Sequence, residues 1–238
     1  MADEKQVKPR GSCLGKLVVL IALLGVAGLG AAVYFIVTPQ DLTDIKGRTS
    51  GLTAPPKAPD LAAVLKKSIE GNYPISLSEE QINLYLQQTL AAKQGGLLGE
   101  FVTMKGVRVR LEEGYAEVIM ERSVMDQPLT LSMYLKIDQY IDVQGRTKGA
   151  LVRGGDPYFP NDPRLEHLIR GGRFGRLEVP QGFLLLVLPA FEKLAGVYQN
   201  ELHLGFEEMS RITFAEGKLV LDPRADGGDL SPGVNGTY

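Results

Sequence analysis

The sequence predicts an α+β protein in which a single N-terminal transmembrane helix precedes one domain of antiparallel sheet and helices. Three observations predict this class. Residues Leu17–Val37 are uncharged and mostly apolar, residues 107–137 alternate apolar with polar side chains, and residues 82–90 repeat apolar side chains at helical spacing. The alternation is typical of an antiparallel sheet with one buried face.

The apolar run Leu17–Val37 predicts a membrane anchor, because a helix of this length rises roughly 30 Å, the thickness of the bilayer hydrocarbon. A cleavable signal peptide is the alternative, since Gly30-Ala31-Ala32 offers small residues for cleavage, but the run continues to Val37, which favours retention. Basic residues are concentrated before the run. We therefore expect a single-pass protein of the cell membrane, with residues 1–16 cytoplasmic and the main domain extracytoplasmic.

Composition divides the rest of the chain into three parts. Residues 38–58 carry several Pro and Gly without apolar periodicity and predict a tether. Residues 59–222 are long enough for one domain with a core. Residues 223–238 are rich in Gly and Pro and predict a disordered tail.

The domain begins with two predicted helices. Residues 62–70 place apolar side chains at helical spacing. Ser78-Glu79-Glu80-Gln81 has the form of a capping box, so a second helix is expected to start there and to close at Gly95-Gly96.

A period of two then predicts strands. A hairpin over residues 107–124 turns at Glu113-Gly114, a third strand covers 129–137, and a further strand lies between Tyr140 and Val152. Gly154–Gly172 is expected to be a long loop, in which the glycines from Gly171 onward indicate flexibility, and residues 174–179 to be extended.

A second long helix is predicted over Gln181–Glu201. Its residues 183–188 are apolar on every face, which requires enclosure by protein or by lipid, although they are too few to span a bilayer. Pro189 is expected to kink this helix unless an element begins there. A short hairpin over residues 212–221, turning at Glu216-Gly217, ends the domain.

Composition and motifs exclude most chemistry. With 26 basic and 28 acidic residues the net charge is −2, so nucleic acid is not an expected partner. One Cys and two His give no metal-ligand spacing, and no nucleophile elbow, phosphate loop or dinucleotide motif is present. We therefore expect no enzyme, no cofactor, no metal and no catalytic residue. A hydrolase without a recognised motif is the remaining enzymatic alternative.

Charged residues of the domain are expected to be solvated. Glu79 and Glu80 are neighbours on a helix and point away from each other, so they do not converge on a substrate. Arg108 and Arg110 share one face of a strand, where they are expected to meet water or lipid headgroups.

The order of motifs resembles the YpmS-like family of membrane-anchored bacterial proteins. The extended piece from Ile75, followed by Ser-Glu-Glu and Ile82-Asn83-Leu84-Tyr85-Leu86, is similar to that family's helix start. Gly175–Pro180 before an apolar helix and the hairpin Ile212–Leu221 are similar to its later motifs. The resemblance implies a curved antiparallel sheet wrapped around a long helix, as in tubular (TULIP-like) lipid-binding domains, and no catalytic residues.

The resemblance and the apolar helix together predict binding of lipid or another amphiphile in the cell envelope. The sheet and the helix can enclose either a dry core or an apolar groove. For a groove, the expected lining residues are Phe183, Leu184, Leu186, Leu188, Phe191, Leu131, Met133 and Leu135. The alternative function is an envelope protein that binds a protein partner or forms a homodimer, for which small residues such as Ala27 and Ala31 permit helix contact.

Overall fold

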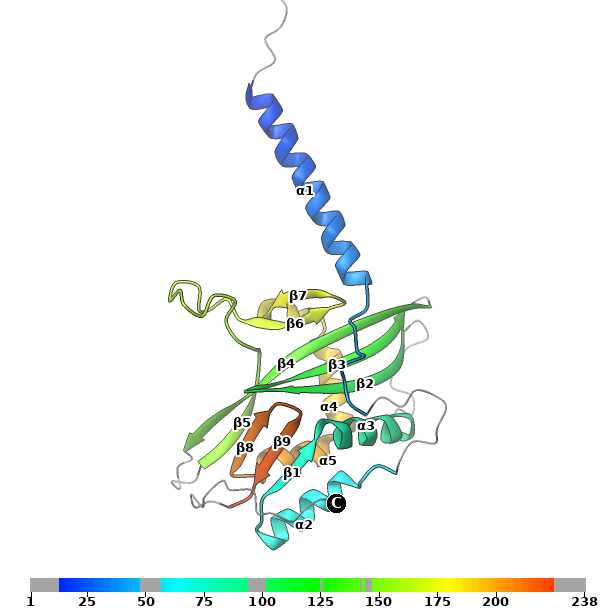
Figure 1. Cartoon of the computed structure of the whole chain (residues 1–238), viewed down its shortest axis with the longest axis vertical. Coiled ribbons are helices and arrows are strands. Elements are labelled where there is room, and N and C mark those ends of the chain that lie inside the picture. The colour runs from blue at the N-terminus through cyan, green and yellow to red at the C-terminus, as the bar shows by residue number, and fades with distance from the viewer. Residues whose placement is uncertain are drawn as a thin grey trace, which may run out of the picture.

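The computed structural model of the chain describes residues 13–47, 57–93, 102–124, 126–141, 143 and 147–224 (Figure 1). The first helix, α1 (Cys13–Val37), projects from a mixed α+β body that contains all the later elements. Its stretch Gly15–Val37 has a mean hydropathy of 2.5 and is not buried. An exposed apolar helix of this length is not the core helix of a soluble domain and fits the predicted membrane anchor.

The first two helices of the body follow the sequence prediction. Helix α2 (Leu61–Gly71) is capped by Asp60, whose side chain accepts a hydrogen bond from the Ala63 amide. Strand β1 (Ile75–Ser78) leads into α3 (Glu79–Lys93). The predicted capping box is confirmed: the Gln81 amide donates to Ser78 Oγ at 3.2 Å, and the Ser78 amide donates to Gln81 Oε1 at 2.9 Å. Gly95-Gly96 lies outside the described residues.

The main sheet is antiparallel and has the order β2-β3-β4-β6-β7, with β5 paired to the far half of β4. Its strands are β2 (Val102–Glu112), β3 (Tyr115–Val124), β4 (Gln127–Ile141), β5 (Thr147–Arg153), β6 (Arg170–Phe174) and β7 (Leu177–Pro180). A second sheet has the order β1-β9-β8 and contains the predicted terminal hairpin, β8 (Arg211–Ala215) and β9 (Lys218–Asp222).

The predicted hairpin of β2 and β3 is confirmed, with Gly114 at φ 81° in its turn. The segment predicted as extended over 174–179 is instead the end of one hairpin strand, a turn at Gly175-Arg176 and the next strand. The glycines before it are not in a flexible loop. Gly172 lies in β6, where an added Cβ would be 2.0 Å from the Ser132 carbonyl oxygen, so its lack of a side chain permits the close approach of β6 to β4.

The predicted long helix over Gln181–Glu201 is wrong. The chain forms a 3₁₀ helix η1 (Gln181–Leu186), then α4 (Leu188–Val197), α5 (Gln199–Leu202) and the π-helical turn η2 (His203–Glu207). Pro189 lies in the first turn of α4. Proline lacks an amide donor and its ring clashes with a preceding helical turn, so an α-helix begins there more readily than it continues.

The core lies between the inner face of the main sheet and a layer made by the helices and the β8–β9 hairpin. Met120 and Ile212 are among its most buried members, together with Val107, Leu111, Met209 and Leu221. Because one helical layer covers only this face, the opposite face of the sheet requires other cover.

Residues 38–47 supply that cover, and we call them the strap. The sequence predicted a tether over 38–58, but Leu42 and Ile45 of the strap are buried against Ile119 of β3. The strap lies across the outer face of the sheet directly after α1 (Figure 1). Residues 48–56 of the predicted tether and residues 225–238 of the predicted tail lie outside the described residues. The α+β class with antiparallel sheets is therefore confirmed, whereas the TULIP-like architecture stays a prediction.

Candidate functional site

An apolar cavity of about 280 Å³ opens between the inner face of the main sheet and α4. Strand pairing builds its floor: Val109 lies opposite Val118 and Val118 opposite Met133, so three strands present one row of side chains. Helix α4 supplies the opposite wall, beginning with Leu188 and Phe191. The full lining is Leu86, Val107, Val109, Val118, Met133, Leu135, Leu151, Arg153, Leu188, Phe191, Glu192, Leu194, Ala195, Tyr198 and Leu202.

The charged groups among these lining residues are Arg153, at the end of β5, and Glu192, on α4. Both are exposed residues, so they belong to the rim of the cavity. The backbone at Arg153 is fixed because its carbonyl accepts a hydrogen bond of 2.7 Å from Gln181 Nε2. Tyr198 also lines the cavity; burial raises its pKa, and its hydroxyl lies 3.2 Å from Thr89 Oγ1. The cavity can therefore hold an apolar chain beside a charged rim.

Four of the eight residues predicted to bind a ligand line this cavity, namely Leu188, Phe191, Met133 and Leu135. The other four do not line it. Leu184 is buried in the core, Phe183 and Leu186 are exposed, and Leu131 lies where β4 pairs with β6.

All of the remaining lining residues were missed by the prediction of binding residues. The alternation over 107–111 had already indicated that Val107 and Val109 share one strand face with Leu111, and this signal could have placed them in the site. Helical periodicity could have placed Tyr198 and Leu202 as well, because they continue the three- and four-residue spacing of Leu188, Phe191 and Ala195.

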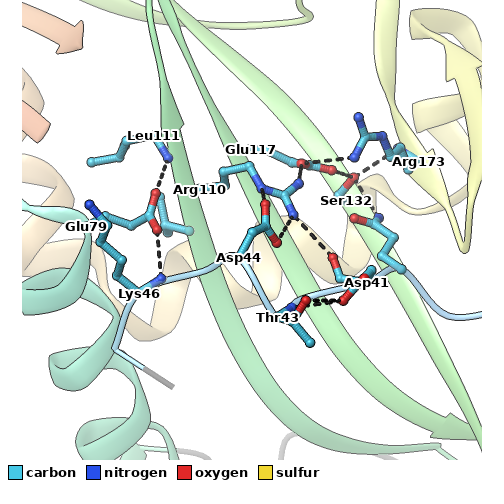
Figure 2. A network of polar contacts seen from close by, with 12 residues as sticks. Asp41, Thr43, Asp44, Lys46, Glu79, Arg110, Leu111, Glu117, Ser132 and Arg173 are labelled. Carbon is cyan, nitrogen blue, oxygen red and sulfur yellow. Dashed lines mark hydrogen bonds and ion pairs between the residues drawn. The ribbon is translucent and has the colours of Figure 1, made fainter. Parts of the chain in front are cut away.

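The outer face of the sheet carries a buried ionic network that fixes the strap (Figure 2). At its centre Glu117 of β3 accepts hydrogen bonds of 2.5 Å from both Arg110 and the Ser132 hydroxyl. Arg110 also donates to the Asp44 carboxylate at 3.0 Å, and Gln40 donates to Ser132 Oγ at 3.2 Å. The network therefore joins two strap residues to three neighbouring strands.

Electrostatics in this network favour the charged forms. Burial alone would lower the pKa of Arg110, but the carboxylates of Asp44 and Glu117 outweigh burial and raise it. Arg173 is a second cation at 3.7 Å from Glu117, and it lies 5.9 Å from the centre of the Tyr134 ring. The prediction that Arg110 meets water or lipid headgroups is therefore wrong, because strap and strand carboxylates occupy its donors. Arg108 is likewise paired, with Glu121.

Helix α3 contributes two buried polar side chains to the open edge of β2. Glu79, which was predicted to be solvated, is only 5% exposed and accepts hydrogen bonds from the amides of Lys46 and Leu111. Asn83 pairs with the amide and the carbonyl of Val109, as a neighbouring strand would. These side chains complete hydrogen bonds of backbone groups on the edge strand β2, and an edge strand with open hydrogen-bonding groups is a template for aggregation.

Potential metal ligands are dispersed over the described residues. Across the described part of the chain, three or more His, Cys, Asp or Glu side chains do not gather in a group that could hold a metal ion. His203 is half exposed and lies 2.8 Å from Glu207 one turn away on the surface. Comparison with known protein families, with curated proteins and with solved structures found no match. The assignment to a YpmS-like family therefore stays a prediction.

Proposed function

We propose that this chain is a membrane-anchored, extracytoplasmic, non-enzymatic protein that holds the apolar chain of a lipid or similar amphiphile. The observation that carries the proposal is the cavity between the main sheet and α4, whose lining is apolar apart from Arg153, Glu192 and the Tyr198 hydroxyl. Ligand sites in proteins are concave and mostly apolar, with a few polar groups that fix orientation. The cavity has this composition.

The size of the cavity favours one acyl chain. Small-molecule sites usually enclose about 300–1,000 Å³, and the cavity, at about 280 Å³, lies just below this range. A two-chain lipid would leave one chain outside. We infer that the polar head remains at the rim beside Arg153 and Glu192.

Photo-crosslinking of the full chain tests this function. The probe is a long-chain fatty acid that carries a diazirine on its alkyl chain, added to the full-length protein in nanodiscs. Mass spectrometry of the digested protein then locates the label. We expect label on peptides that contain Met133, Leu135 or Phe191, and competition by unlabelled fatty acid.

A pair of matched variants separates cavity binding from partition of the probe into the nanodisc. Val118→Phe places a ring in the cavity, whereas Val152→Phe makes the same change on β5, where the residue is 42% exposed and does not line the cavity. We expect Val118→Phe to abolish labelling of the lining peptides and Val152→Phe to retain it. Equal labelling of both variants, or label confined to α1, would refute the proposal.

A further inference from the structure

Three large apolar side chains of η1 are exposed together. Phe183, Leu185 and Leu186 are 52%, 73% and 74% exposed, while Leu184 between them is only 3% exposed. Single exposed apolar residues are ordinary, but a group of them on one turn marks a contact surface. The sequence requires these residues to be enclosed by protein or by lipid, and the folded domain encloses Leu184 alone.

The turn that carries these side chains is held firmly by the domain. The Gln181 amide donates to the Ile169 carbonyl at 2.9 Å, and its side chain donates to the Arg153 carbonyl. Leu184 is part of the hydrophobic core. The exposed side chains are therefore presented by a fixed support and not by a loose loop.

Hairpin β6–β7 connects η1 to the end of α1. At the hairpin turn the Arg176 amide donates to the Phe35 carbonyl at 2.9 Å. Gly175 lies so close to α1 that an added Cβ would be 2.3 Å from the Ile36 carbonyl oxygen. The hairpin lies directly below the end of α1 and runs across the long axis of the molecule (Figure 1). Strand β7 ends at Pro180, so η1 follows on the same side of the domain.

The length of α1 determines how deep the hairpin side of the domain lies relative to the bilayer. The stretch Gly15–Val37 has 23 residues and as a helix rises roughly 34 Å, slightly more than the roughly 30 Å of hydrocarbon in a bilayer. Phe35 therefore falls at the boundary between hydrocarbon and headgroups. The hairpin turn bonded to Phe35 lies at that depth, and the strap holds the body in this orientation through Gln40 and Asp44.

We propose that η1 is a second membrane contact, in which Phe183, Leu185 and Leu186 insert into the leaflet on the domain's side. The occupant of this surface is lipid, because η1 follows the hairpin whose turn is bonded to the end of a helix that is long and apolar enough to span the membrane. The insertion resembles that of interfacial helices, whose apolar faces enter the boundary between headgroups and acyl chains. Leu188 of the cavity wall follows two residues after Leu186. If the cavity has the proposed function, the membrane contact of η1 also places the cavity beside the membrane that supplies its amphiphile.

Fluorescence of single tryptophans in the full chain tests the membrane contact. The chain contains no Trp, so Phe183→Trp and Leu186→Trp each introduce the sole tryptophan. The variants are placed in nanodiscs, one copy in each, made of phosphatidylcholine or of phosphatidylcholine brominated on its acyl chains. Tyr140→Trp is the control, because Tyr140 is 50% exposed and lies on the far half of β4, which pairs with β5.

We expect brominated lipid to quench Phe183→Trp and Leu186→Trp strongly and Tyr140→Trp weakly. Equal quenching at all three positions would overturn the proposal. Blue-shifted emission without quenching by bromine would also overturn it, because a protein surface would then cover η1. The Val118→Phe change, added to Phe183→Trp, separates the two proposals, because it should abolish fatty acid labelling of the lining and leave the quenching unchanged. If the lining of the unsubstituted cavity is not labelled either, persistent quenching supports the membrane contact and refutes the cavity function.

Discussion

Asn83 allows a quantitative test of how α3 satisfies the edge of β2. Its side-chain amide donates to the carbonyls of Val109 and Lys46 at 2.8 and 3.1 Å, and its oxygen accepts from the Val109 amide at 2.7 Å. Asn83 is fully buried. In Asn83→Ala, three backbone groups lose their partner. Lys46 lies at the surface, where water can replace the lost bond, so the two groups of Val109 dominate the loss.

A buried polar group left without a hydrogen bond costs about 1–3 kcal/mol. At about 1.5 kcal/mol for each group of Val109, we expect Asn83→Ala to lower the free energy of unfolding by about 3 kcal/mol. The assay is urea unfolding of the full chain in a mild detergent, followed by tyrosine fluorescence. Asn200→Ala, at an exposed position of α5, is the control and should change stability by less than about 0.5 kcal/mol. A loss for Asn83→Ala that equals the control would refute the role of Asn83 as a substitute strand.

Three further changes probe stability by the same unfolding assay. Glu117→Gln leaves Arg110 and Arg173 without their shared buried carboxylate and should cost about 3 kcal/mol, whereas the exposed Glu166→Gln should be near neutral; equal effects would contradict the ionic network. Gly172→Ala forces a methyl group against the Ser132 carbonyl and should lower the free energy of unfolding by more than about 2 kcal/mol. Gly196→Ala, in open space on α4, should raise it by about 0.5–1 kcal/mol. A neutral Gly172→Ala would contradict the close approach of β6 to β4. Burial opposes ionisation of Asp222, but hydrogen bonds from Arg224 and the charge of Arg211 outweigh burial and lower the pKa of Asp222 below the ordinary 3.8. The stabilisation from ionised Asp222 is therefore present above pH 3.8 and is lost as the pH falls through the folded-state pKa. Asp222→Asn should flatten this loss of stability in acid, and an unchanged pH profile would contradict the role of Asp222.

Local signals account for the elements that the sequence predicted. The capping box at Ser78 and the turn glycines of the hairpins act between residues two or three positions apart, so they are visible in any short window of sequence. The strap is different. Leu42 and Ile45 stand alone among polar and proline residues, and their partner Ile119 lies on a strand face that otherwise carries Glu117 and Glu121. Such a contact joins distant segments and has no periodicity to reveal it.

Only half of the predicted binding residues line the candidate site, for a related reason. Strand alternation correctly chose Met133 and Leu135, because a period of two fixes which face a residue occupies. The apolar run after Gln181 carries no such information, since every position is hydrophobic. It folds as a 3₁₀ helix, in which residues three apart share a face, so Phe183 and Leu186 point together to the exterior while Leu184 points to the core.

The strap and η1 have a joint consequence for how the domain meets its membrane. A domain on a flexible tether would sample many orientations, and any membrane contact would then have to offset the entropy lost on orienting it. Here the buried hydrogen bond of Gln40, the ion pair of Asp44 with Arg110 and the hydrogen bond from Arg176 to Phe35 fix the orientation within the folded chain. In the proposed membrane contact, the apolar side chains of η1 would therefore enter the leaflet without a further ordering cost. We expect Glu117→Gln to loosen the strap by removing the shared partner of Arg110 and Ser132. It should then weaken quenching of Phe183→Trp by brominated lipid even under conditions where the domain stays folded.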